Sequence, residues 1–303
     1  MFTIQTAGNQ FLSSLNTLES NITRTNREVS SGLRVQTLSD DPTAVSAILQ
    51  LNAQIATNNQ IQINLASAQT EVNTAESAIN SATQLMDTAS SIAAEGSSTG
   101  STTNRPQLAL QVKDIISEMQ QLANTSVQGK FVFSGNEDQT APYGSVDLTT
   151  PTGMGAYQGG TSNRSVLDPY GVSMQIAYTA QQIFDGGPSG TPSTSVLQSL
   201  TELYNALNSN DAAATATAAT DVKSAANYLD SQQAIYGDIQ NRITNALQAQ
   251  STLKTNLQAQ LSTVQDADEA QAVVQQQSQS TALNAAETAY ASLPKKSLFD
   301  YLA

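Results

Sequence analysis

The chain has 303 residues, a net charge of −13 at pH 7 and charged side chains at only 12% of its positions, against the ~25% usual in soluble domains. Cysteine, histidine and tryptophan are absent, which excludes disulfides, thiolate nucleophiles, zinc sites built on Cys or His, and a Ser-His-Asp triad. The negative charge without a basic stripe argues against nucleic acid and anionic membranes as partners. No run approaches the ~20 apolar residues of a membrane span, and the first residues lack the pattern of a cleaved signal peptide.

The first predicted helix ends at a glycine. Its apolar side is spaced in steps of four and three, as in a coiled coil, at Phe11, Leu15, Leu18, Ile22, Thr25 and Val29. Gly32 breaks this pattern. Ser39, Asp40 or Asp41 can then cap a second helix by accepting backbone N–H groups, and Pro42 suits its first turn. We interpret the two aspartates as caps, because no partner group for acid–base catalysis accompanies them.

Heptad spacing resumes after the bend and predicts a second helix over 43–94 and, after a polar hinge at 95–106, a third helix over 108–122. Helical spacing returns at 196–207. It then runs through a long segment, 222–264, and continues more loosely to Tyr290 before Pro294.

The middle of the chain follows different rules. The sequence GKFVFSG at 129–135 predicts a short strand that enters a turn, and YGVSMQIAY at 170–178 alternates apolar and polar residues as strands do. Glycine and proline are frequent up to residue 192. We therefore expect a β-rich insertion.

The predicted fold is mainly α with a β-rich insertion. Both chain ends form a long antiparallel coiled-coil stalk, with a small β head in the middle. The predicted divisions are terminal assembly helices at 1–42 with 265–303, a helical stalk at 43–128 with 193–264, and the head at 129–192.

The segment VSSGLRVQTLSDDPTAVSAILQL at 29–51 resembles the N-terminal block of the flagellin superfamily, in which one helix ends at S-S-G-x-R and another starts after D-D. GKFVFSG and the ending SLFDYL at 297–302 resemble the hook–filament junction family within it, that of hook-associated protein 3. The resemblance covers both chain ends and the entry to the head. LPKKSL at 293–298 departs from that family's pattern, because it is more charged.

The resemblance implies a structural adaptor of the bacterial flagellum, without enzymatic activity or cofactor, that joins the hook side to the flagellin filament. Its implied partners are other copies in a ring, the hook-side junction protein, flagellin, and an export chaperone on the C-terminal helix. It would lie outside the cell, exported without a cleaved signal peptide. We expect the terminal helices to be mobile in the free chain and ordered on assembly.

Two groups of residues carry these expectations. The expected assembly residues are Phe11, Leu15, Leu18, Ile22, Val29, Leu253, Leu257, Leu261, Val264 and Leu283. The expected bend residues are Gly32, Arg34, Asp40, Asp41 and Pro42.

Several alternatives stay open. The apolar spacing at the chain ends also fits a coiled coil closed within one chain. The protein could instead be a flagellin-type filament subunit; an enzyme or an unrelated coiled-coil adhesin fits the sequence less well. A further hypothesis pairs basic with acidic residues across the terminal helices: Arg24, Arg27 and Arg34 with Asp266, Asp268 and Glu269.

Overall fold

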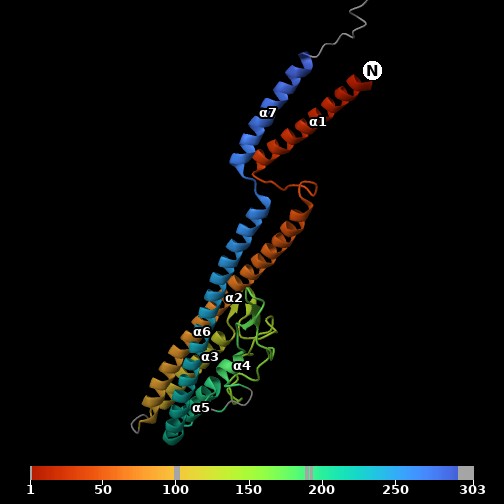
Figure 1. Ribbon diagram of the computed structural model, residues 1–303. Helices are drawn as coiled ribbons and strands as arrows, with labels where there is room; N and C mark the ends of the chain where they lie inside the picture. The colour runs from red at the N-terminus through yellow and green to blue at the C-terminus, as the bar shows by residue number, and fades with distance from the viewer. Residues whose placement is uncertain (1, 99–102, 188–190, 192–193, 293–303) are drawn as a thin grey trace, which may run out of the picture. The chain divides into compact units, whose positions relative to one another are not determined.

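The computed structural model describes residues 2–98, 103–187, 191 and 194–292 and is mostly helical (Figure 1). The chain divides into two compact units. Unit 1 comprises Met1–Thr57 with Lys254–Ala303, and unit 2 comprises Asn58–Leu253. The predicted division into terminal helices, stalk and head stays a prediction.

Seven helices occur in the described residues: α1 (Phe2–Ser31), α2 (Pro42–Ser97), α3 (Arg105–Ala123), α4 (Ala180–Phe184), α5 (Val196–Asn208), α6 (Ala212–Gln265) and α7 (Glu269–Ser292). The predicted mainly helical class is confirmed. The sequence did not predict the short α4. It also extended the last long helix to Tyr290, whereas the structure interrupts it between Gln265 and Glu269. Pro294 and SLFDYL lie outside the described residues.

Unit 2 contains one large apolar core. Fully buried side chains from α2, such as Leu65, Ile79 and Met86, meet others from α3, α5 and α6, such as Ile116 and Leu229. Each of these four helices contributes fully buried side chains to the core.

The two long helices run antiparallel within this unit. The Gln240 amide of α6 donates to Glu76 of α2 at 2.5 Å, and Gln250 donates to the Asn58 carbonyl. The order of these contacts along the two helices requires opposite directions.

The segment between α3 and α5 contains two antiparallel two-stranded sheets. Strand β1 (Ser126–Val127) pairs with β2 (Lys130–Phe131), and β3 (Ser165–Leu167) pairs with β4 (Ser173–Gln175). The predicted strands exist, but they are only two or three residues long. Most of the segment is turns and loops, so "β-rich" overstates its strand content.

This middle segment shares the core of the helices. Phe133 stacks edge-on against Phe184 and Tyr236 at ring distances of 5.6 and 6.4 Å. Arg164 forms an ion pair with Glu71 of α2 and donates to the Val132 carbonyl at 2.8 Å. Burial raises the pKa of Glu71 even though Arg164 opposes this shift.

A buried arginine closes the end of unit 2 where α2 and α5 stop. Arg105 is only 2% exposed. Its guanidinium donates to the carbonyls of Gly96 and Ser98 at 2.7 and 3.0 Å and to the Asn210 side chain at 2.9 Å. It therefore satisfies carbonyls that the end of α2 leaves without helical partners.

The described residues indicate neither a membrane-spanning helix nor a metal site. None of their helices is long and apolar enough to cross a bilayer. They also contain no cluster of three or more Asp, Glu, His or Cys side chains that could hold a metal ion.

Candidate assembly site at the chain ends

The two ends of the chain meet in unit 1, where α1 and α7 lie side by side (Figure 1). The rings of Phe11 and Tyr290 stack at 5.3 Å with an interplanar angle of 8°. The Gln276 amide donates to Asn26 at 2.6 Å. These two contacts fix an antiparallel pair.

The contact between α1 and α7 uses the spacing found in the sequence. Half-buried or buried positions recur in steps of three and four on both helices: Phe11, Leu15, Leu18, Ile22, Thr25 and Val29 on α1, and Ala272, Gln276, Gln279, Leu283 and Ala286 on α7. We call these residues the seam. Among the described side chains of α1 and α7, only Thr25 and Ala272 are buried. One partner helix therefore leaves most of the seam half-covered.

The two helix breaks of unit 1 are bonded to each other, and we call this contact the joint. The backbone N–H groups of Arg34 and Val35 donate to the Gln265 carbonyl at 2.8 and 3.2 Å, and Ala267 N–H donates to the Gly32 carbonyl at 2.9 Å. The α1–α2 connector thus pairs with the α6–α7 connector, as an isolated bridge between Leu33 and Asp266 also shows.

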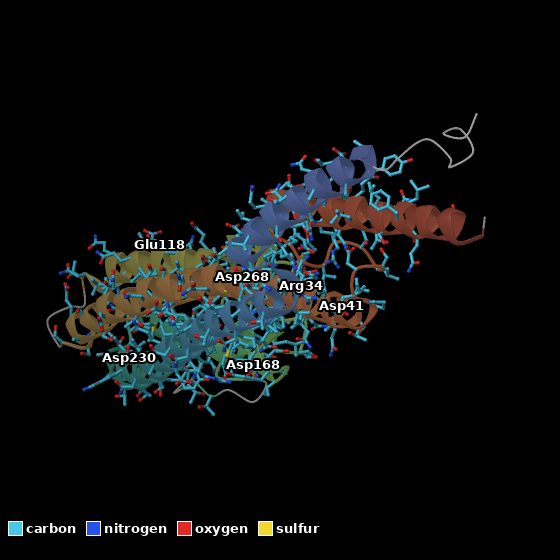
Figure 2. All side chains as sticks on the ribbon, turned by 45° about the horizontal axis from the view of Figure 1, so that its top comes forward. Arg34, Asp41, Glu118, Asp168, Asp230 and Asp268 are labelled. Atoms are coloured by element: carbon cyan, nitrogen blue, oxygen red, sulfur yellow. The ribbon has the colours of Figure 1, made fainter. Side chains whose placement is uncertain are left out.

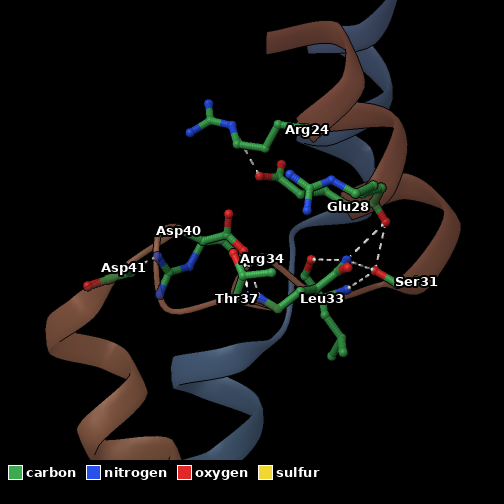
Figure 3. Close-up of polar contacts among 10 residues, drawn as sticks. Arg24, Glu28, Ser31, Leu33, Arg34, Thr37, Asp40 and Asp41 are labelled. Carbon is green, nitrogen blue, oxygen red and sulfur yellow. Dashed lines mark hydrogen bonds and ion pairs between the residues drawn. The ribbon is translucent and has the colours of Figure 1, made fainter. Parts of the chain in front are cut away.

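Arg34 and the two aspartates stabilise the joint (Figure 3). Arg34 donates to Asp41 at 3.2 Å and to the Val264 carbonyl at 2.7 Å. Asp41 is the residue that caps α2, since its carboxylate accepts from Ala44 N–H at 3.0 Å. Hydrogen bonds from Thr43, Ala44 and Arg34 lower the pKa of Asp41 to about 2.

Asp40 stabilises the connector itself. Its carboxylate accepts from the N–H groups of Gln36 and Thr37 at 3.1 and 2.8 Å. These backbone bonds, with that of Thr37 first, lower the pKa of Asp40. The carboxylates of both aspartates are therefore occupied by local donors, as capping requires.

The other helix ends at the joint are also satisfied. Gly32 has a positive φ of 71°, a conformation that favours glycine just after the end of a helix. Its N–H donates to the backbone carbonyl of Glu28 at 2.8 Å. Asp268 caps α7 by accepting from Gln271 N–H at 3.0 Å. The interruption between α6 and α7 is thus a capped restart.

A small apolar cluster lies beside the joint. Val35, Ala44 and Ile48 are buried, and Leu261 and Val264 pack against them. Two of the expected assembly residues therefore have partners within the chain.

The remaining expected assembly residues are distributed unevenly. Leu257 is 7% exposed, and Leu253 is half-buried and belongs to unit 2. The expected bend residues all lie at or beside the joint. Whether any of these residues contacts another molecule stays a prediction.

The hypothesis of charge pairing across the terminal helices is wrong in its partners. Arg24 pairs with Glu28 at 3.7 Å on its own helix, and Arg34 pairs with Asp41. Asp268 shares only a polar hollow of about 230 Å³ with Arg24 and Arg34. Figure 2 labels Asp268 near Arg34. Asp268 instead caps α7 by accepting from Gln271 N–H.

Sequence reasoning missed the second half of the joint. Asp268 followed by Glu269 is a helix-start signal, but the apolar spacing from Val264 to Ala272 conceals it. The backbone bonds of the joint link two connectors that lie about 230 residues apart in the sequence, as Arg34 and Val264 do. Contacts between such distant residues leave no local pattern in the sequence.

Comparison with known proteins identifies relatives of both chain ends. The family model of the bacterial flagellin N-terminal helical region matches residues 3–138, and that of the bacterial flagellin C-terminal helical region matches residues 219–302. Both matched regions include helices that meet at the joint.

Two curated relatives are named flagellar hook-associated protein 3. The Salmonella typhimurium protein is 31% identical over 160 residues, which cover 52% of this chain and 48% of the relative. The Escherichia coli protein is 28% identical over 238 residues, which cover 76% and 71%. The match thus spans about half the length of the Salmonella protein.

Solved structures share the fold. A putative flagellar hook-associated protein from Vibrio parahaemolyticus has a TM-score of 0.63 at 23% identity and covers 74% of this chain and 99% of its own. Flagellar hook associated protein-3 from Legionella pneumophila has a TM-score of 0.61 at 16% identity, with 72% and 98% covered.

Proposed function

The chain belongs to the flagellin superfamily of structural flagellar proteins, and from this premise we propose that it is the adaptor that joins the hook side of the flagellum to the flagellin filament. The observation that carries the proposal is the similarity over 238 residues to a flagellar hook-associated protein 3. The motif GKFVFSG and the bend at the joint support it.

The proposed mechanism is assembly through the terminal helices. In the part of the chain that the structure describes, α1 and α7 pack chiefly on each other at the seam, and helices gain most of their stability from packing. Neighbouring copies would cover what remains exposed, so the terminal helices would be mobile in the free chain and ordered in a ring of copies. The joint would carry this order to α2 and α6.

The proposed partners follow from the same role. One face of the ring would meet the hook-side junction protein and the other would meet flagellin. An export chaperone would hold the C-terminal helix before assembly, and the protein would reach the flagellum without a cleaved signal peptide. We propose no catalytic step and no cofactor.

A flagellin-type filament subunit is the second candidate, because the two matching family models are those of flagellin itself. The two functions predict different positions along the flagellum. Filament subunits would occur along its whole length, whereas an adaptor would occur only next to the hook.

Immunogold electron microscopy of isolated flagella tests the proposal. We expect gold only at the hook–filament junction. Labelling along the filament would favour the second candidate, and flagella without label would contradict both. Purified chain incubated alone provides the control, since an adaptor should not form long filaments without flagellin.

A further inference from the structure

Both terminal helices carry a long stretch without any charged side chain. None occurs from residue 1 to 18 or from residue 270 to 286. Solvent-facing helices in soluble proteins are usually rich in charge. The missing charge predicts that, in the working protein, other sides of these helices are covered as well as the seam.

Each stretch has an exposed face that is distinct from the seam. The outer face of α1 is lined by Asn9, Leu12, Ser13, Asn16, Thr17 and Ser20, around a shallow hollow of about 610 Å³. The outer face of α7 is lined by Val274, Gln277, Ser278, Thr281, Ala282 and Ala285, around one of about 580 Å³. Both hollows follow the helical steps of three and four, and both are uncharged.

Large apolar side chains project from these faces. Leu12 is 52% exposed and Val274 is 70% exposed, whereas the seam residues Leu15 and Leu283 are half-buried. The hydroxyl groups of Thr17 and Thr281 donate to carbonyls of their own helices at 2.9 and 2.8 Å. Their donors are already satisfied, so covering them costs little desolvation.

The pattern fits a second copy of the same chain better than an unlike protein. Each copy has a net charge of −13, and copies with like charge approach most easily through uncharged surfaces. An unlike partner selected by charge would be expected to meet the acidic side chains instead.

We propose that the outer face of α1 in one copy packs against the outer face of α7 in the next. Contact between two different faces continues from copy to copy and forms a ring where the rotation closes, whereas contact between two identical faces ends at a dimer. This inference rests on the proposed function for the ring. It adds a contact on the opposite sides of these helices to the cover that neighbouring copies would give the half-covered seam.

The absence of cysteine makes the contact directly testable by disulfide formation. We would make two full-length single variants, Asn16→Cys and Ser278→Cys, and oxidise an equal mixture, both as purified chain at high concentration and on flagella that carry both variants. Random collisions would give as much mixed dimer as the two unmixed dimers together. The proposed contact should give an excess of mixed dimer of at least about fivefold.

Ser231→Cys in place of Ser278→Cys is the matched control, because Ser231 is exposed on α6 next to the charged Asp230. We expect no excess of mixed dimer with Asn16→Cys. An excess as large as that of the Ser278→Cys mixture would overturn the inference, as would random proportions in that mixture.

The readouts separate this inference from the proposed function. Protein located at the hook–filament junction with random disulfide proportions would contradict the inference and leave the proposed function standing. An excess of mixed dimer from purified chain, with no immunogold label at the hook–filament junction, would support the contact and contradict the proposed function.

Discussion

The α1–α7 pair and the core of unit 2 have the same apolar spacing but very different burial. In unit 2, four helices and the middle segment surround side chains such as Leu65 and Leu229 completely. In the α1–α7 pair, Leu15 and Leu283 at equivalent spacing are only half-buried. The comparison shows that apolar spacing identifies the side of a helix that packs against another element. The number of packing partners then decides how much stability that side contributes.

A matched pair of leucine truncations tests this difference most strongly. Leu65→Ala should lower the free energy of unfolding by about 2–5 kcal/mol, because it leaves a cavity in a closed core. Leu15→Ala makes the same chemical change on a half-covered seam and should cost about 1 kcal/mol. Urea unfolding followed by circular dichroism measures both, and equal losses would contradict the comparison.

Two arginines that bind helix-end carbonyls extend the test to polar groups. Arg105→Met should cost about 2–3 kcal/mol, since it leaves buried carbonyls at the end of α2 without a donor. Arg34→Met should cost under ~1 kcal/mol, because the side chain of Arg34 is 47% exposed and water can replace its bonds. Thermal unfolding of both variants provides the measurement. A larger loss of stability for Arg34→Met than for Arg105→Met would contradict this comparison.

We expect Asp185 to make the stability of unit 2 depend on pH. Burial raises its pKa from 3.8 to about 6, although Tyr143 and Ser195 donate to it. The folded chain therefore holds a proton that the unfolded chain has lost, and stability falls as the pH rises from about 4 to 6.

Asp185→Asn should remove this slope and raise stability at pH 7 by roughly 1–2 kcal/mol. Urea unfolding at a series of pH values would show it, with Asp230→Asn, an exposed residue of α6, as the control. A variant that keeps the slope of the parent would exclude Asp185 as its source.

Asp41 at the joint should give a pH dependence opposite to that of Asp185, and the smallest effect of these changes. Its pKa is lowered from 3.8 to about 2, so its contribution is complete above pH 3.8 and is lost as the pH falls through 2. Asp41→Ala should speed amide hydrogen exchange at Thr43 and Ala44 above that range and change nothing below it. Unchanged exchange near pH 5 would show that Asp41 is not the effective cap.

Much of the helical fold could be predicted from the sequence because its signals are local. Gly32, the aspartates and Pro42 mark one bend within eleven residues, counted from Gly32 to Pro42. The strands could not be predicted as well. Val132 and Phe133 are both buried, and their backbones bond to Thr125 and Ala180 without forming a long ladder.

The candidate site was predictable only in part. The seam follows from heptad spacing, but spacing alone cannot distinguish a partner within the chain from one in another copy. The uncharged outer faces were visible in the sequence as stretches without charge, and only the exposure of Leu12 and Val274 shows that they face away from the seam. The break before Glu269 depends on bonds to Gly32 and Arg34 that form only in the folded chain.

The joint is made chiefly of main-chain bonds, from Arg34, Val35 and Ala267 to carbonyls of Gln265 and Gly32. Such bonds do not depend on which side chains are present, so evolution is free to change most of the residues there. It is not free to change their number: a residue inserted into one connector would shift every donor past its carbonyl unless the other connector lengthened too. Related chains should therefore differ widely in composition at this place while keeping the lengths of the two connectors matched.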